Sequence, residues 1–351
     1  MLSVNNPIIL IIIMKHSVII LSLILLLSCH RTSEQVEPQS FDFETTIDAT
    51  FDKVKINEVI KPVDFMATKN YLIVLHDAES SEDQLYVYSL DSLRFLYSFA
   101  QKGTGPLETI ALDVFRNAGN NDYIDLFDQS NYKRLRYSLT DSGAVMVQSC
   151  HLDLPNLGPL QETWWVNDSV IVFSTMNWEL FTFNVNTDSV IDTFRMSDLF
   201  DGIADSSDSH KLCDFQFSLC GDRLAIGLLY VKQLLTGRIL NNKIEVDLPN
   251  GELIRVPESL NREYYTFVSQ SDSLIFAQYI GRPQQFIPKL GPFMPDFTQE
   301  IGCFDKDLKP VCKIIPDIQT PRFYIDRKNN RILCWDQTSD FEYIYTFPIP
   351  N

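Results

Sequence analysis

The chain has 351 residues, with 46 acidic against 29 basic side chains and a formal net charge of −17. A chain this acidic is repelled by phosphate backbones, and no basic stripe offsets the repulsion, so we expect no nucleic-acid partner. The 12% of aromatic residues and the 17 prolines fit an all-β fold.

The first 28 residues have the pattern of a targeting signal. Val18 to Leu27 is aliphatic apart from Ser22, and Lys15-His16 precedes it. The apolar run has the length of a signal-peptide core and is shorter than a membrane span. Translation can start at Met1 or at Met14; a start at Met14 gives the usual layout of a basic start, an apolar stretch and a small residue before the processing site.

The apolar run ends in Leu26-Leu27-Ser28-Cys29, which resembles the lipobox of bacterial lipoproteins. The resemblance implies that Cys29 becomes the first residue of the mature chain and that its thiol carries a diacylglycerol. We therefore expect a lipid-anchored protein of the cell envelope, held at the outer membrane on its periplasmic or surface face. The alternative is an ordinary cleaved signal peptide followed by a chance cysteine.

Residues 29–40 are predicted to be a flexible tether. His30 to Ser40 is polar, contains no aromatic residue and includes Pro38, so it cannot bury apolar surface. We place the start of the folded domain at Phe41 and its end at residue 351. Residues 1–28 contain one lysine and no acidic residue, so their removal changes the net charge from −17 to −18.

The folded part is organised by a short segment that occurs six times, in which Asn or Asp precedes an apolar run. The intervals between the opening residues are too even for unrelated strands, which indicates a repeat architecture. The six segments are Asn70–Asp77, Asp122–Asp128, Asp168–Phe173, Asp222–Gly227, Asp272–Ala277 and Asn330–Asp336.

Each repeat is predicted to be a four-stranded antiparallel meander, because turn residues separate four short apolar runs. The recurring segment is the second strand, and its continuous apolar character indicates that both of its faces are covered. Radially stacked sheets produce this pattern. We place the inner strands at Val63–Ala67, Ala111–Phe115, Glu162–Val166, Phe215–Leu219, Tyr265–Val268 and Arg322–Ile325.

The last repeat lacks one strand, since the chain stops soon after Tyr343 to Phe347. Thr46 to Phe51 precedes the first inner strand and alternates apolar and polar residues, as a half-exposed outer strand does. We expect this segment to supply the missing edge and to close the ring. The predicted fold is an all-β, six-bladed β-propeller of four-stranded antiparallel blades, closed by an N-terminal strand.

With its lipobox and six repeats, the chain resembles the TolB-like six-bladed β-propeller lipoproteins. Gly103-Thr104-Gly105-Pro106-Leu107-Glu108 leaves the first blade where that family shows a Gly-x-Gly-Pro-Gly-Glu-like turn, with Leu107 in place of the usual glycine. The resemblance implies a fold and a membrane anchor. It supplies no catalytic residues, because members of the family are largely without assigned activity.

Binding sites of propellers usually lie where the connections between blades gather around the central channel. This rule selects the interblade turns and the exits of the second strands. In the turns, glycine with positive φ followed by proline has a purely structural explanation, and the aspartates have one as turn caps. The candidate rim residues are Asp77, Lys102, Thr104, Glu108, Asp128, Gln161, Glu162, Arg282 and Asp336.

No catalytic or metal motif stands out in the sequence. It contains no Gly-x-Ser-x-Gly, Ser-x-x-Lys or His-Glu-x-x-His pattern, and its histidines show no ligand spacing. We therefore predict no catalytic residue, metal site or cofactor.

Of the six cysteines after Cys29, Cys303 and Cys312 are expected to face each other across a hairpin, and Cys334 is expected to be a buried thiol.

Three functions follow from these features. The first is a lipid-anchored recognition module that binds a protein, peptide or glycan partner in the envelope, and the anchor, the tether and the lack of catalytic motifs favour it. The second is a propeller enzyme of hydrolase or lyase type with an acidic site at the channel mouth. The third is a structural subunit of an envelope complex, which would present a contiguous apolar patch.

Overall fold

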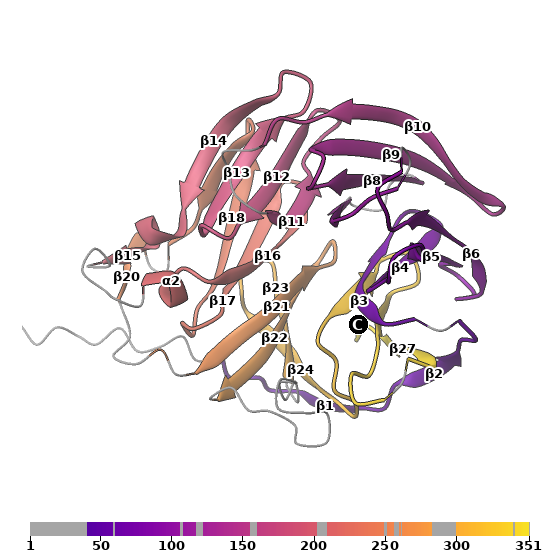
Figure 1. Ribbon diagram of the computed structural model, residues 1–351. Coiled ribbons are helices and arrows are strands. Elements are labelled where there is room, and N and C mark those ends of the chain that lie inside the picture. The colour runs from indigo at the N-terminus through magenta and orange to yellow at the C-terminus, as the bar shows by residue number, and fades with distance from the viewer. Residues whose placement is uncertain are drawn as a thin grey trace, which may run out of the picture. The chain divides into compact units, whose positions relative to one another are not determined.

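Figure 1 shows the computed structural model of the chain, in which nearly all regular elements are β-strands. The structure describes residues 41–58, 60–105, 108–116, 122–154, 160–201, 209–248, 251–255, 260, 262–282, 300–339 and 341–350. The chain divides into two compact units, Met1–Glu37 and Pro38–Asn351. All described residues belong to the second unit, so the predicted signal peptide and tether lie outside them.

Four-stranded antiparallel sheets, each formed by strands consecutive in sequence, are the building blocks of this unit. One contains β3 (Pro62–Ala67), β4 (Tyr71–His76), β5 (Asp83–Ser89) and β6 (Phe95–Gln101). Another contains β16 (Phe215–Cys220), β17 (Arg223–Leu228), β18 (Leu234–Leu240) and β19 (Lys243–Val246). Both have the predicted meander order.

Two further meanders are fused into one eight-stranded sheet. The first is β7 (Leu112–Arg116), β8 (Tyr123–Asp128), β9 (Lys133–Thr140) and β10 (Gly143–His151). The second is β11 (Leu160–Trp165), β12 (Val170–Thr175), β13 (Glu179–Asn184) and β14 (Ser189–Arg195). The parallel pairing of β7 with β11 joins them, so the described strands do not separate into the six four-stranded sheets that were predicted.

N-terminal strands complete the last two sheets. The five-stranded sheet contains β21 (Glu263–Gln270), β22 (Leu274–Arg282), β23 (Glu300–Asp305), β24 (Pro310–Pro316) and the parallel strand β1 (Thr46–Ala49). The last sheet contains β25 (Phe323–Asp326), β26 (Arg331–Cys334), β27 (Tyr343–Pro348) and β2 (Asp52–Lys55).

The N-terminal closing strand exists, but the prediction of its residues was wrong. Thr46–Ala49 pairs with β24, whereas Asp52–Lys55 forms the antiparallel edge beside β27. The alternation that suggested an outer strand instead turns Ala49 and Phe51 into the core between the last two sheets, where each is 3% exposed. The true edge strand is more polar, because only Val54 packs inward and its charged neighbours face solvent.

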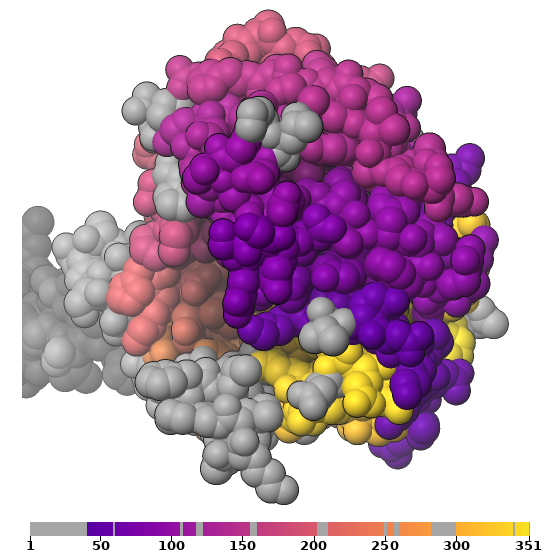
Figure 2. Space-filling view, turned by 45° about the vertical axis from the view of Figure 1, so that its right-hand side comes forward, coloured from indigo at the N-terminus to yellow at the C-terminus, as the bar shows by residue number. Residues whose placement is uncertain are grey.

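The inner strands lie around a common centre. Contacts run from β7 to β11, β16, β21, β25 and back to β3, and Arg116 of β7 completes the circle by donating from Nη1 to the Phe65 carbonyl at 3.4 Å. Figure 2 shows the first sheet, in purple, beside the last sheet, in yellow. All six predicted inner strands are confirmed to within two residues at each end. This is the arrangement of a β-propeller with four-stranded antiparallel blades.

Face-to-face stacking of the sheets forms the core. The second strands are buried on both faces, and in β12 all six residues are buried. Val172 and Leu180 of one sheet pack in the same cluster as Phe217 and Ile226 of the next. The continuous apolar runs in the sequence are explained by this double coverage.

The remaining elements are short. They are the 3₁₀ turn η1 (Met196–Leu199), the paired strands β15 (Phe200–Asp201) and β20 (Ile254–Arg255), and the single-turn helix α2 (Ser209–Leu212). In the β23–β24 hairpin Cys303 lies directly opposite Cys312, as predicted, and both thiols are free. Cys334 is fully buried, also as predicted.

Candidate functional site

Charged side chains gather where the inner strands meet. Asp64 comes from β3, Asp113 and Arg116 from β7, Glu162 from β11, and Arg322 directly precedes β25. The strands that carry them are otherwise mostly apolar and are held in place by the sheets behind them. Five ionisable groups that are far apart in the sequence therefore share one small region at the centre of the propeller.

Two guanidinium groups converge on one carboxylate. Arg116 Nη2 pairs with Asp64 Oδ2, and Arg322 Nη1 lies 3.1 Å from the same oxygen. Arg322 Nη1 also lies 3.4 Å from Glu162 Oε1. The Asp64 and Glu162 side chains are only 9% and 5% exposed, so these ion pairs are shielded from water. Asp64 Oδ1 accepts a further bond from the Phe65 N–H at 2.8 Å.

Asp113 has no guanidinium partner in the described structure. It accepts hydrogen bonds from the Val114 N–H at 2.8 Å and from Thr163 Oγ1 at 3.3 Å. The side chain is half-buried and lines the cavity described below. Burial raises the pKa of Asp113 to about 7, against the opposing effect of the Val114 hydrogen bond. This carboxyl group therefore titrates close to neutral pH.

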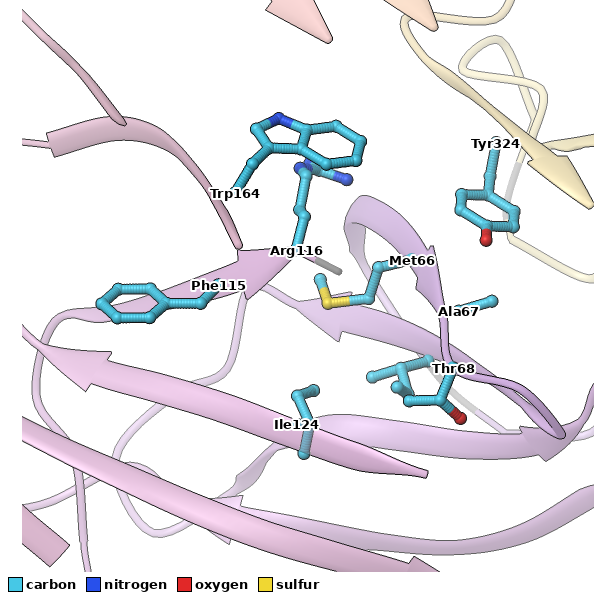
Figure 3. A pocket seen from close by; sticks show the side chains of 9 residues that line it. Met66, Ala67, Thr68, Phe115, Arg116, Ile124, Trp164 and Tyr324 are labelled. Atoms are coloured by element: carbon cyan, nitrogen blue, oxygen red, sulfur yellow. The ribbon is translucent and has the colours of Figure 1, made fainter. Parts of the chain in front are cut away.

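The neighbouring groups are shifted by the same environment. Burial raises the pKa of Glu162, although Arg116 and Arg322 oppose the shift. Burial alone would lower the pKa of Arg116, but the charges of Asp64 and Glu162 outweigh it and the pKa rises. Figure 3 shows a neighbouring pocket, distinct from the cavity described below, in which the Arg116 guanidinium lies beneath the Trp164 ring; the centre of this ring is 5.8 Å from Arg116 Cζ. Tyr324 lies across the pocket, and burial raises its pKa to about 12.

A cavity of about 220 Å³ opens beside this cluster. It holds a small group rather than a large ligand, since drug-sized ligands occupy roughly 300–1,000 Å³. Apolar residues supply part of the wall, and the charged side chains supply the rest. The lining residues are Val63, Asp64, Met66, Leu75, Asp113, Val114, Arg116, Gln161, Glu162 and Arg322.

Two of the sequence-predicted rim residues line this cavity. Glu162 is buried within the charge cluster, and Gln161 is exposed at its edge. Asp64, Asp113, Arg116 and Arg322 were missed. In the sequence, these residues stand out only as charged residues near the ends of apolar inner strands. A search confined to interblade turns and to the exits of the second strands does not include these positions.

Four other predicted residues lie close together at the exit of the first sheet. Lys102 Nζ donates to the Ala78 carbonyl at 2.7 Å, next to the exposed Asp77. Lys102 also forms a parallel bridge with Thr109, beside Glu108. Thr104 is exposed in the same turn. None of these four side chains lines the 220 Å³ cavity.

Glu108 explains the glycines of this turn better than backbone conformation does. Neither Gly103 nor Gly105 has a positive φ, so our explanation of these two glycines by a positive φ was wrong. The Gly105 N–H donates to Glu108 Oε2 at 2.7 Å, and a Cβ on Gly105 would lie 2.9 Å from Glu108 Cδ. A side chain at either glycine would therefore have to displace the end of the Glu108 side chain.

Two of the remaining candidates have structural roles, and the side chain of the third lies outside the described residues. Asp128 is 1% exposed and accepts bonds from the Ser130 N–H at 3.1 Å and Asn131 Nδ2 at 2.6 Å. Asp336 accepts bonds from the N–H and the hydroxyl of Thr338 at 2.9 and 2.8 Å. Both are turn caps. Arg282 ends β22, and its side chain, like Cys29, lies outside the described residues.

The described part of the chain offers no group of three His, Cys, Asp or Glu side chains arranged to hold a metal ion. Its helices are single turns, and none of them is long and apolar enough to cross a membrane. Carboxyl and guanidinium groups around a small cavity can form ion pairs and hydrogen bonds with a polar ligand.

Comparisons with known proteins support the fold. No family model matches the chain, and no curated protein sequence matches it. A crystal structure of a DUF4221 family member from Bacteroides vulgatus matches with a TM-score of 0.50 at 13% identity, covering 84% of this chain and 97% of that one. The WD40 repeats of RRP9 give a TM-score of 0.49 at 8% identity, covering 88% and 100%. At 13% identity, the DUF4221 structure supports a β-propeller-type fold and nothing about function.

Proposed function

We propose that this protein is a binding module of the cell envelope that takes a protein, peptide or glycan partner at the central cavity. The observation that carries the proposal is the 220 Å³ cavity lined by charged side chains from four inner strands or their starts. These groups lie on or next to strands that are hydrogen-bonded into the sheets, so they are presented in a fixed geometry, which lowers the entropic cost of binding.

The lipid anchor and the six-bladed fold are part of the same proposal. The Leu26-Leu27-Ser28-Cys29 motif supports a lipid anchor on Cys29, with residues 29–40 as a tether to an outer-membrane surface. The fused sheet contains two four-stranded meanders, so counting each meander as one blade gives the six blades of the TolB-like lipoproteins.

Replacing Cys29 with serine should move the protein from the membrane fraction to the soluble fraction without changing its melting temperature. Wild-type protein that is soluble and carries no lipid would refute the anchor.

Site-specific photo-crosslinking tests where the partner binds. Val63 lines the cavity and is 48% exposed, whereas Val145 is 59% exposed on β10, at the outer edge of the fused sheet. A benzophenone amino acid at residue 63 should crosslink to the partner in intact cells, and the same group at residue 145 should not. Crosslinking from residue 145 alone would place the partner on the outer edge and contradict the proposal.

A further inference from the structure

Glu162 has hydrogen-bond acceptor capacity left inside the cavity. Its side chain is 5% exposed, and Oε1 accepts from Arg322 Nη1 at 3.4 Å. A side-chain hydrogen bond with Trp164 also favours the ionised form. Each carboxylate oxygen offers two acceptor positions, so the group can accept further hydrogen bonds from a ligand that brings donors.

The charges of the site are also unbalanced. Three carboxyl groups, those of Asp64, Asp113 and Glu162, face two guanidinium groups, which leaves one negative charge in excess when all are ionised. Both guanidinium groups contact Asp64. Asp113 and Glu162 destabilise each other's ionised form, as like charges do. A cation beside these two carboxyl groups would balance the charges of the site when all five groups are ionised.

We propose that the cavity binds a primary ammonium group of a polypeptide partner, held between Glu162 and Asp113; this inference rests on the proposed binding function. An ammonium group has three donors and no acceptor, which matches the free acceptor positions of two carboxylates. A lysine side chain fits the rest of the cavity, because its methylene groups can lie against Val63, Met66 and Leu75. The acidic chain as a whole attracts such a partner.

Binding should be linked to proton release. Asp113 faces Arg116 on its own strand, Glu162 on β11, Asp64 on β3 and Arg322 before β25. Its pKa of about 7 means that it is partly protonated at neutral pH, and a bound ammonium favours the ionised form. Affinity should therefore rise between pH 6 and 8. A lysine side chain, with a pKa of about 10.4, keeps this affinity at pH 9, whereas an α-amino group, with a pKa of about 7.7–8.0, loses it.

Calorimetric titration of the full mature chain with three short amidated peptides tests this. The probes are N-acetylated Gly-Lys-Gly, the same peptide with an acetylated lysine, and Gly-Gly-Gly with a free amino terminus. We expect the charged probes to bind at least about tenfold more tightly than the acetyl-lysine probe, since each charge-assisted hydrogen bond contributes roughly this factor. At pH 7, phosphate and Tris buffers should give different apparent enthalpies, because a proton is released.

Asp113→Asn should abolish the proton release, and Glu162→Gln should weaken binding about tenfold. Asp307→Asn removes the same charge in the exposed β23–β24 hairpin and serves as the control. Equal affinity for the acetyl-lysine probe, or unchanged binding by both cavity variants, overturns the inference. If glycans bind in a Glu162-dependent manner and all three peptides fail, the binding function stands and the ammonium inference is wrong. If the partner binds equally to wild type and to both cavity variants, both are wrong.

Discussion

At the scale of single residues, Asp113 links the candidate site to stability. Its pKa is raised by burial to about 7, well above the value of about 3.9 in an unfolded chain. The folded state therefore holds this proton more tightly than the unfolded state does. Ionised Asp113 destabilises the fold, so its contribution worsens as pH rises from about 4 to 7 and is constant above that range.

Asp113→Asn should remove this penalty. We expect the variant to gain about 1–2 kcal/mol relative to wild type at pH 8, after a reduction for the water that reaches the group, and close to nothing at pH 4. Urea denaturation of both proteins at the two pH values measures the difference. A gain of the same size at both pH values would show that the effect does not come from titration of Asp113.

Glu108 gives a second prediction at this scale. Gly105→Ala should destabilise the fold by about 0.5–1.5 kcal/mol, because the new Cβ would displace the end of the Glu108 side chain and break its hydrogen bond with the Gly105 N–H. In a Glu108→Ala background the same substitution should cost much less, since the obstructing side chain is gone. A thermal double-mutant cycle reads out the coupling. Additive effects would mean that the backbone, and not Glu108, requires the glycine.

At the scale of elements, one buried ion-pair network stabilises the β8–β9 hairpin. Asp125 on β8 is 3% exposed and accepts bonds from Arg134 Nε at 2.8 Å and Arg136 Nη2 at 2.9 Å on β9. The Arg134 and Arg136 guanidinium carbons lie 4.6 and 5.2 Å from the centre of the Trp165 ring. The network therefore ties this hairpin to β11 of the adjoining meander.

Asp125→Ala should destabilise the protein by about 3–5 kcal/mol, because it leaves two guanidinium groups without their partner, one of them buried. The control is Glu179→Ala, which breaks the more exposed pair with Arg195 and should cost less than about 1 kcal/mol. Denaturant titration compares the two variants. Similar losses would indicate that the Asp125 network contributes little beyond a surface pair.

The sequence predicted most of the strands because their signals are local. An Asn or Asp before an apolar run places the second strand, and the meander then places its neighbours. The strand Asp52–Lys55 was not predicted, because only Val54 marks it as a strand and because its partner β27 lies nearly 300 residues away in the sequence. The cavity residues were not predicted for a related reason. Asp64, Arg116 and Arg322 form a cluster only when the ring of sheets brings the inner strands together.

At the scale of the whole molecule, the two N-terminal strands connect the beginning of the chain to its end. β1 adds to the five-stranded sheet, and β2 completes the last sheet. Phe51 between them packs against Phe347, with ring centres 5.2 Å apart. The ring of sheets therefore depends on residues that precede the first inner strand.

Truncation from the N-terminus should show which residues belong to the tether and which are needed for the stability of the fold. A chain that begins at Phe41 should melt close to the mature protein, whereas one that begins at Ile56 should lose about 3 kcal/mol or more, because it exposes the edges of two sheets and the cavity left by Phe51. Scanning calorimetry of the two truncated chains makes the comparison. Equal melting temperatures would contradict the closing role of β1 and β2.

The most direct test of the account is hydrogen–deuterium exchange of the protein with and without its crosslinked partner or, if it binds, the lysine probe. A ligand in the cavity should slow exchange in peptides that cover residues 62–67, 112–116 and 160–165, the inner strands that line it. Peptides that cover β10 and β14 should be unchanged. Protection confined to those outer strands would contradict the claim that the centre of the propeller is the binding site.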